Sequence, residues 1–190
     1  MQELKKIFDL RNDIIEKSIF NDALSEEGVF ETILPNLVES KIIETPEVQY
    51  AYFSQDEMKI NAYDVNSTGE RLLIFVLNTK SLDISSNSDN LLISSKSDYD
   101  RIFKMSRTFI DKAIKKHITV PADIAGILIS KLANSSFIND IDVIEIFQVS
   151  LTATIEKRGV LNSLKNIDFK DDIIHVNYFV KREGFGSSNK

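Results

Sequence analysis

Residues 48–80 read VQYAYFSQDEMKINAYDVNSTGERLLIFVLNTK, and this stretch decides the fold. Three runs rich in Val, Ile, Tyr and Phe, at residues 48–53, 58–65 and 72–80, are separated by polar turns of hairpin length. They predict a three-stranded antiparallel meander. The third run contains LLIFVL, which lacks polar alternation, and such a strand is usually covered on both faces. We therefore expect helices to pack on this sheet.

On either side of the meander, apolar residues recur at helical spacing or gather in further β-type runs. The spacing predicts helices over residues 2–22, 26–40, 97–116 and 119–134, and the further strands are expected at 143–154 and 173–181. Pro35 should kink or break the second helix. Thr119, two residues before Pro121, is the expected cap of the last helix. The predicted class is α/β.

The chain of 190 residues is long enough for one domain with its own core. We expect a single domain over residues 1–183. Residues 81–97 contain seven serines and little apolar area, which predicts a mobile loop. Residues 184–190 should form a disordered tail.

Composition narrows the function classes. The formal net charge is -6, which disfavours binding to nucleic acid without excluding it. The absence of cysteine excludes thiol chemistry and disulfides. The two histidines are explained more simply without a metal-binding role. His117 is a cation at a helix end, and His175 is a strand residue. The N-terminus interrupts its apolar residues with charges and has no membrane-spanning run, so we expect a cytoplasmic protein without a membrane partner.

The element order, a helix, a three-stranded meander, a helix and a further strand, is that of the restriction-endonuclease-like, PD-(D/E)xK, core. Its chemistry needs an acid on the second strand, and an acid two residues before a lysine on the third. The second strand offers Asn61 or Asp64, and the third offers Asn78 and Lys80. Glu31 is the candidate helical carboxylate. Asp64 would be the metal ligand, holding Mg²⁺ that activates water for attack on a phosphodiester.

This candidate site lacks one of its acids. Asn78 stands where the pattern needs a carboxylate, and a neutral amide is a weak Mg²⁺ ligand. Each remaining residue also has a simpler explanation. Asp64 flanks a turn, Lys80 ends a strand, and Glu31 lies on a helix surface. The site is therefore predicted to be degenerate, with no cofactor unless the nuclease interpretation holds.

Residues 28–79, GVFETILPNLVESKIIETPEVQYAYFSQDEMKINAYDVNSTGERLLIFVLNT, resemble the N-terminal region of the abortive infection phage resistance (AIPR) family. Within them, Lys59 to Tyr63 (KINAY) is similar to the family's K-I-N-G-Y strand. Arg107 and Phe109 in FKMSRTFIDKAIKKH are similar to its Arg-x-Phe helix step. The resemblance extends over roughly residues 4–183. It implies a role in bacterial defence against phage and a nuclease-type fold with an eroded site, and it assigns no catalytic residues.

Three interpretations follow. The first is a non-catalytic, nuclease-like interaction or assembly module of a phage-defence protein. The second is an active Mg²⁺-dependent nuclease that uses Glu31, Asp64 and Lys80 and tolerates Asn78. The third is a generic protein-binding α/β domain. The expected partners are another protein or the remainder of a longer parent chain, and a homo-oligomer stays open.

Overall fold

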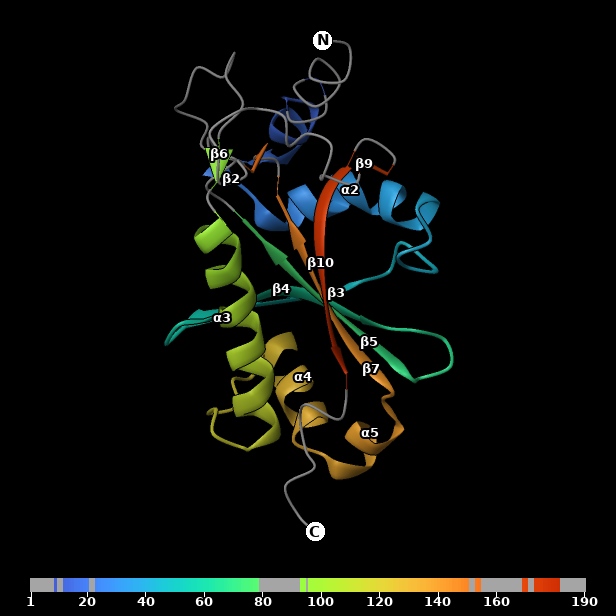
Figure 1. Ribbon diagram of the computed structural model, residues 1–190, viewed down its shortest axis with the longest axis vertical. Helices are drawn as coiled ribbons and strands as arrows, with labels where there is room; N and C mark the ends of the chain where they lie inside the picture. Colours follow the sequence, from blue (N-terminus) through green and yellow to red (C-terminus); the bar gives the residue numbers. More distant parts are fainter. Residues whose placement is uncertain are drawn as a thin grey trace. The chain divides into compact units, whose positions relative to one another are not determined.

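The computed structural model describes residues 9, 12–20, 23–78, 93–94, 96–150, 153–154, 169–170 and 173–181. Its elements are β1 (Ile19–Phe20), β2 (Ala23–Leu24), α2 (Glu26–Glu39), β3 (Gln49–Gln55), β4 (Met58–Val65), β5 (Arg71–Leu77), β6 (Ile93–Ser94), α3 (Lys96–Ile114), α4 (Ile124–Leu132), α5 (Ser135–Asp140), β7 (Val143–Val149), β8 (Ala153–Thr154), β9 (Phe169–Lys170) and β10 (Ile173–Lys181) (Figure 1). Residues 12–18, before β1, are also helical. The architecture is mixed α/β, as predicted.

The chain divides into two compact units. The first unit comprises Met1–Pro46, Leu77–Asp100 and Val149–Val176. The second unit comprises Glu47–Val76, Arg101–Gln148 and Asn177–Lys190. Each unit is built from separate pieces of the sequence. The single domain expected over residues 1–183 stays a prediction.

The main sheet has the strand order β3-β4-β5-β7-β10-β9. The predicted meander is confirmed, because β3, β4 and β5 pair antiparallel in sequence order. A bulge interrupts the β3–β4 register between Tyr50 and Phe53. β7 lies beside β5 and runs parallel to it. At the start of the two strands the N–H groups of Asp142 and Val143 donate to the Glu70 carbonyl, and farther along Phe147 stacks on Phe75.

Helices of the second unit contact both faces of the meander. Phe109 of α3 lies against Phe53, with 5.1 Å between ring centroids, and Phe53 pairs with Ile60 on one face. The ammonium group of Lys131 on α4 lies 5.4 Å from the ring centroid of Tyr63, which is on the other face. Residues 72–77 are all buried. The expectation that LLIFVL is covered on both faces is therefore confirmed.

In the first unit, α2 follows the predicted segment 26–40 closely. Ser25 caps it, since its hydroxyl accepts a hydrogen bond from the Gly28 N–H at 3.1 Å. Its buried face consists of Val29, Phe30, Ile33, Leu34 and Leu37. The break expected at Pro35 is wrong, because the helix continues through this exposed residue to Glu39. Burial of one apolar face stabilises the helix across the hydrogen bond that proline cannot donate.

Three boundaries differ from the sequence predictions. The first helix does not reach residue 22, since Ile19–Phe20 pairs with Ala23–Leu24 instead. α4 begins at Ile124 and not after Thr119, because the Asp123 carboxylate caps it by accepting from the Gly126 N–H at 2.9 Å. The predicted strand 143–154 ends at Val149, and Ala153–Thr154 pairs with Ile93–Ser94.

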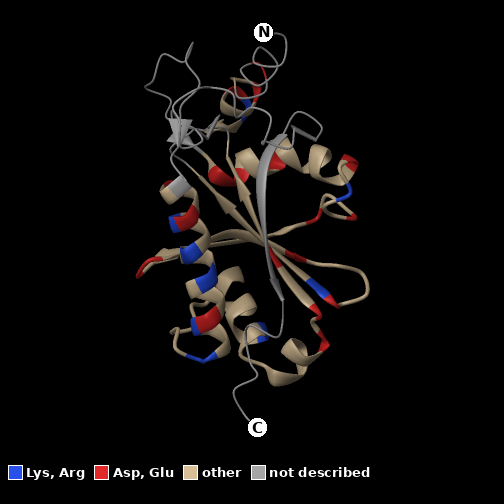
Figure 2. Cartoon of the chain, viewed as in Figure 1, with Lys and Arg blue, Asp and Glu red and all other residues tan. Residues whose placement is uncertain are grey.

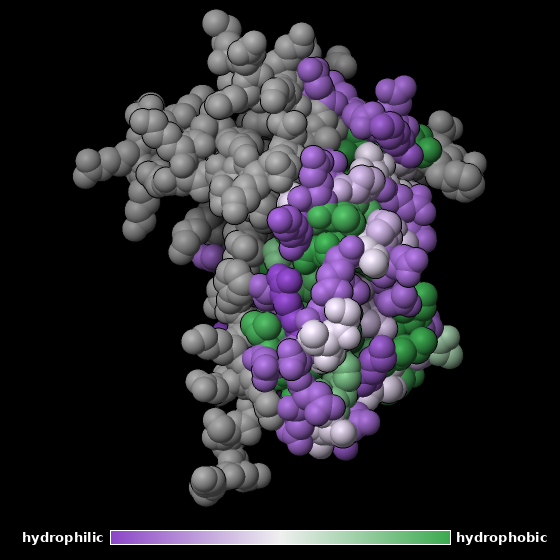
Figure 3. Space-filling model, turned by 90° about the vertical axis from the view of Figure 1, so that its right-hand side faces the viewer, coloured by the Kyte–Doolittle hydropathy of each residue, from purple (hydrophilic) through white to green (hydrophobic). Residues whose placement is uncertain are grey.

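Other predictions fall largely outside the described residues. These are the serine-rich loop, apart from residues 93–94 and 96–97, and the tail at 184–190. Among the helices that the structure describes, none combines the length and the apolar composition needed to cross a membrane. Figure 3 shows one face of the molecule, where hydrophilic side chains prevail and apolar ones form small patches.

Candidate functional site

The strand register assigns the candidate residues of β4 to the two faces of the sheet. Asp64 pairs with Leu73 of β5, and Tyr63 pairs with Ile74. Because paired residues of antiparallel strands point to the same face, Asp64 shares the face of Leu73. Asn61 lies two residues before Tyr63 and shares its face. Asn61 and Asp64, the two alternatives on this strand, therefore point in opposite directions.

Asn78 directly follows β5. It belongs to the first unit, whereas Leu73 and Asp64 belong to the second. The Asn78 side chain is buried and its amide donates to the Ser150 hydroxyl at 3.3 Å. Its backbone N–H donates to the Val149 carbonyl at 2.9 Å. The structure therefore gives Asn78 structural hydrogen bonds.

The remaining candidates do not complete a set of acids. Glu31 is exposed on α2, in the first unit, whereas Asp64 belongs to the second unit. Lys80 lies outside the described residues. Within the described ranges there is no group of three or more His, Cys, Asp or Glu side chains that could hold a metal ion. The candidate set of Glu31, Asp64, Asn78 and Lys80 stays a prediction.

Sequence reasoning missed Gln148, near the end of β7. Its side chain is fully buried, and among the residues that the structure describes neither the nitrogen nor the oxygen of the amide has a hydrogen-bond partner. Such a group loses its water without compensation, which is costly. The signal was present as a polar residue in the apolar run VIEIFQV. Because Gln148 and Ser150 are two residues apart, strand alternation assigns their side chains to the same face.

Sequence reasoning also missed an ion pair between β5 and β7. The Arg71 Nε donates to the Glu145 carboxylate, and the Glu145 side chain is only 6% exposed. Asn66 supports the same strand end, because its side-chain oxygen accepts from the Arg71 backbone N–H at 2.8 Å. The ion pair joins the neighbouring parallel strands β5 and β7 near the start of both. Its geometry explains an acid in the apolar β7 as a structural residue.

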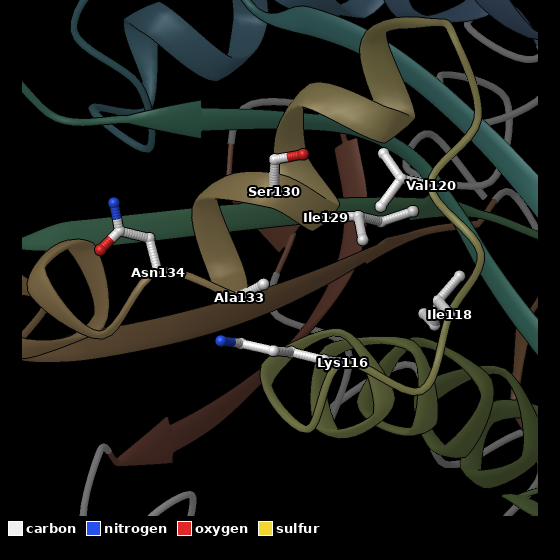
Figure 4. Close-up of a pocket in the computed structure, with 7 residues that line it drawn as sticks. All are labelled: Lys116, Ile118, Val120, Ile129, Ser130, Ala133 and Asn134. Atoms are coloured by element: carbon white, nitrogen blue, oxygen red, sulfur yellow. The ribbon is translucent and has the colours of Figure 1, made fainter.

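A hollow lies beside α4 (Figure 4). It has a volume of about 380 Å³ and is lined by Lys116, Ile118, Val120, Ile129, Ser130, Ala133 and Asn134. Ile118 and Val120 come from the segment after α3, and the others, apart from Lys116, come from α4 and the residues that follow it (Figure 4). Val120, one of its lining residues, is 53% exposed. The hollow is mainly apolar, with one ammonium group at its edge.

The comparisons with known proteins give one family. The model of the abortive infection phage resistance protein N-terminal domain matches residues 29–179. No curated protein and no solved structure matches the chain. The match includes the meander, α3, α4 and the strands after them.

Proposed function

Because this chain belongs to the abortive infection phage resistance family, as the match over residues 29–179 shows, we propose that it is a non-catalytic, nuclease-like interaction module of a phage-defence protein. Such a module acts by contact with another protein, with nucleic acid or with the remainder of a longer parent chain. No divalent metal takes part in this role.

The order of the strands supports the nuclease-like part of the proposal. A helix, α2, precedes the antiparallel strands β3, β4 and β5, and α3 leads on toward β7. β7 then lies parallel beside β5. A helix, a meander, a helix and a neighbouring strand are the elements of the restriction-endonuclease-like core. The resemblance is one of topology, and function must be argued from the site.

The observation that carries the non-catalytic part is the pattern of faces. Metal-dependent phosphodiester cleavage needs carboxylates that converge on one cation, because hard divalent cations require anionic oxygen ligands. Asp64 points to the face of Leu73, whereas Asn61, the other candidate on β4, points to the opposite face and carries an amide. Asn78, the candidate that follows β5, also supplies an amide where the pattern requires a carboxylate.

The test is a cleavage assay on the purified full chain. Single- and double-stranded DNA and RNA are incubated with Mg²⁺ or Mn²⁺, and binding of each cation is titrated by calorimetry. We expect neither cleavage nor saturable binding of the cation. Cleavage that is lost in Asp64→Asn or in Lys80→Ala, but kept in the control Asp56→Asn on the exposed β3–β4 turn, would overturn the proposal and establish the nuclease.

A further inference from the structure

Charge is distributed very unevenly along the chain. Residues 26–57 hold eight Asp or Glu and one Lys. Residues 101–117 hold six Lys or Arg against one Asp, a net charge of +5 in a chain whose total is -6. Figure 2 shows basic residues along α3 with acidic residues among them, and acidic residues on α2 and on turns of the sheet. The total charge therefore conceals a basic segment at residues 101–117, although α3 itself also carries Asp98, Asp100 and Asp111.

The basic side chains of α3 lie on its exposed side. Arg101, Lys104, Arg107 and Lys115 are exposed, while Phe109 and the other apolar residues of the helix are buried. At a rise of 1.5 Å per residue, Arg101 and Lys115 are about 21 Å apart along the helix axis. We call Arg101, Lys104, Arg107, Lys112, Lys115 and Lys116 the α3 basic stripe.

Most of the α3 basic stripe is not neutralised. In the part of the chain that the structure describes, Lys104, Arg107, Lys112 and Lys116 take part in no ion pair. Lys115 contacts Asp111 at 3.4 Å, but both side chains are well exposed, so the pair is weak. Arg101 has a contact of 3.9 Å with the sulfur of Met105.

This arrangement is unfavourable for the helix by itself. Arg101, Lys104 and Arg107 follow one another at three-residue spacing, and like charges at that spacing repel. Asp100 and Asp111, which lie four residues from Lys104 and Arg107 respectively, offset part of this repulsion, but neither Lys104 nor Arg107 forms an ion pair in the described chain. A bound polyanion would relieve it. We propose that the α3 basic stripe binds the phosphate backbone of nucleic acid.

A row of phosphates suits the stripe better than an acidic protein does. A DNA duplex carries about one charge per 1.7 Å of axis with both strands counted, so a length equal to that of the stripe holds about 12 charges, part of which face it. The stripe contains no exposed apolar anchor of the kind that protein interfaces use, since Phe103 and Phe109 are buried. For the same reason α3 offers no aromatic surface for stacking bases. Binding should therefore be independent of sequence and strongly dependent on salt.

The inference goes beyond the proposed module and is tested separately from catalysis. Binding of fluorescent duplex DNA, single-stranded DNA and single-stranded RNA to the full chain is followed by anisotropy in EDTA, between about 50 and 200 mM salt. The logarithm of the association constant should fall linearly with the logarithm of salt concentration. For a duplex the slope should be about -0.9 per phosphate neutralised. The order of affinity among the three probes identifies the preferred nucleic acid.

The variant Lys104→Glu/Arg107→Glu should weaken binding at least about tenfold and reduce the slope by about two. Its control is Lys17→Glu/Lys41→Glu, which makes the same change in net charge at exposed residues outside α3 and should change binding less than about twofold. Circular dichroism checks that both variants are folded. Absence of saturable binding at the lowest salt, or equal loss in the two variants, would overturn the proposal. So would self-association of the wild type that only the α3 variant abolishes, which would assign the stripe to an acidic protein surface.

Discussion

Gly126, the third residue of α4, lets the preceding segment pack against the helix. A Cβ at this position would lie 1.8 Å from the Pro121 carbonyl oxygen and 3.2 Å from Val120 Cγ1. Since real Cβ atoms stay at least 3.0 Å from such atoms, Gly126→Ala forces a displacement of about 1.2 Å, the difference between 3.0 and 1.8 Å. The displacement also strains the cap, because the Asp123 carboxylate accepts from the Gly126 N–H at 2.9 Å.

The free energy of unfolding should fall although alanine is the better helix former. The substitution gains about 1 kcal/mol of helix propensity. Overpacking against a backbone atom costs about 1–3 kcal/mol. Loss of the Asp123 cap costs about 1 kcal/mol more. The net expectation is a loss of about 1–3 kcal/mol.

Urea denaturation of wild type and variant measures this change, and with a slope of about 1–3 kcal/mol/M the midpoint should fall by roughly 1 M. Ser130→Ala is the matched control, because Ser130 is exposed on the same helix and should gain a few tenths of a kcal/mol. If Gly126→Ala unfolds at the wild-type midpoint or above it, the close approach of Pro121 to α4 does not exist in solution. The packing that forms the hollow beside α4 would then be wrong as well.

Three further substitutions test single interactions by the same urea assay. Asp123→Ala should cost about 1 kcal/mol and Asp123→Asn only a few tenths, because Asn also caps helices, and equal losses would contradict the assigned cap. Gln148→Met should stabilise the protein by about 1 kcal/mol, since it removes a buried amide that has no partner in the described part of the chain, and a loss of stability would mean that the amide is bonded in solution. Glu145→Gln leaves the Arg71 guanidinium without its carboxylate. Arg71 is 32% exposed and is partly rehydrated, so the loss should be about 2 kcal/mol and not the larger value of a fully buried pair. No loss would contradict the ion pair.

Local sequence was sufficient where polar turns bracket an apolar run. β4 begins at Met58 and ends at Val65 as predicted, because turn residues stand on both sides of it. Local sequence was insufficient to predict a helix start where two candidate N-caps compete. Thr119 and Asp123 flank Pro121, and the choice of Asp123 depends on how closely the chain approaches Gly126. α5, with no buried residue, gave no periodic signal at all.

The candidate site was harder to predict than the fold because it depends on register. Spacing along one strand shows which residues share a face, as for Asn78 and Lys80 in the sequence. It does not show which face of the next strand they join, and a shift of one residue in register reverses the answer. Asp64 was selected as an acid near the right position, and its pairing with Leu73 assigns it to the face away from Asn61.

The ion pair of Arg71 and Glu145 illustrates the same limit at longer range. The two residues are 74 positions apart, so nothing local to either one identifies the other as its partner. What the sequence did contain was the anomaly of one acid and one amide, Glu145 and Gln148, within the apolar β7. Buried polar groups need hydrogen-bond partners, so Glu145 and Gln148 were each expected to have one on a neighbouring strand. Glu145 has one, whereas the Gln148 amide has none within the described ranges.

Binding a phosphodiester and cleaving it require different chemical groups. In a metal-dependent nuclease, the cation both binds the phosphate and activates the water that attacks it. Where no carboxylates converge on a cation, phosphates must be held in another way, and lysine and arginine are the side chains that can do so without a metal. They attract the phosphodiester but do not supply a nucleophile. Binding by the α3 basic stripe would therefore not by itself cleave a nucleic acid.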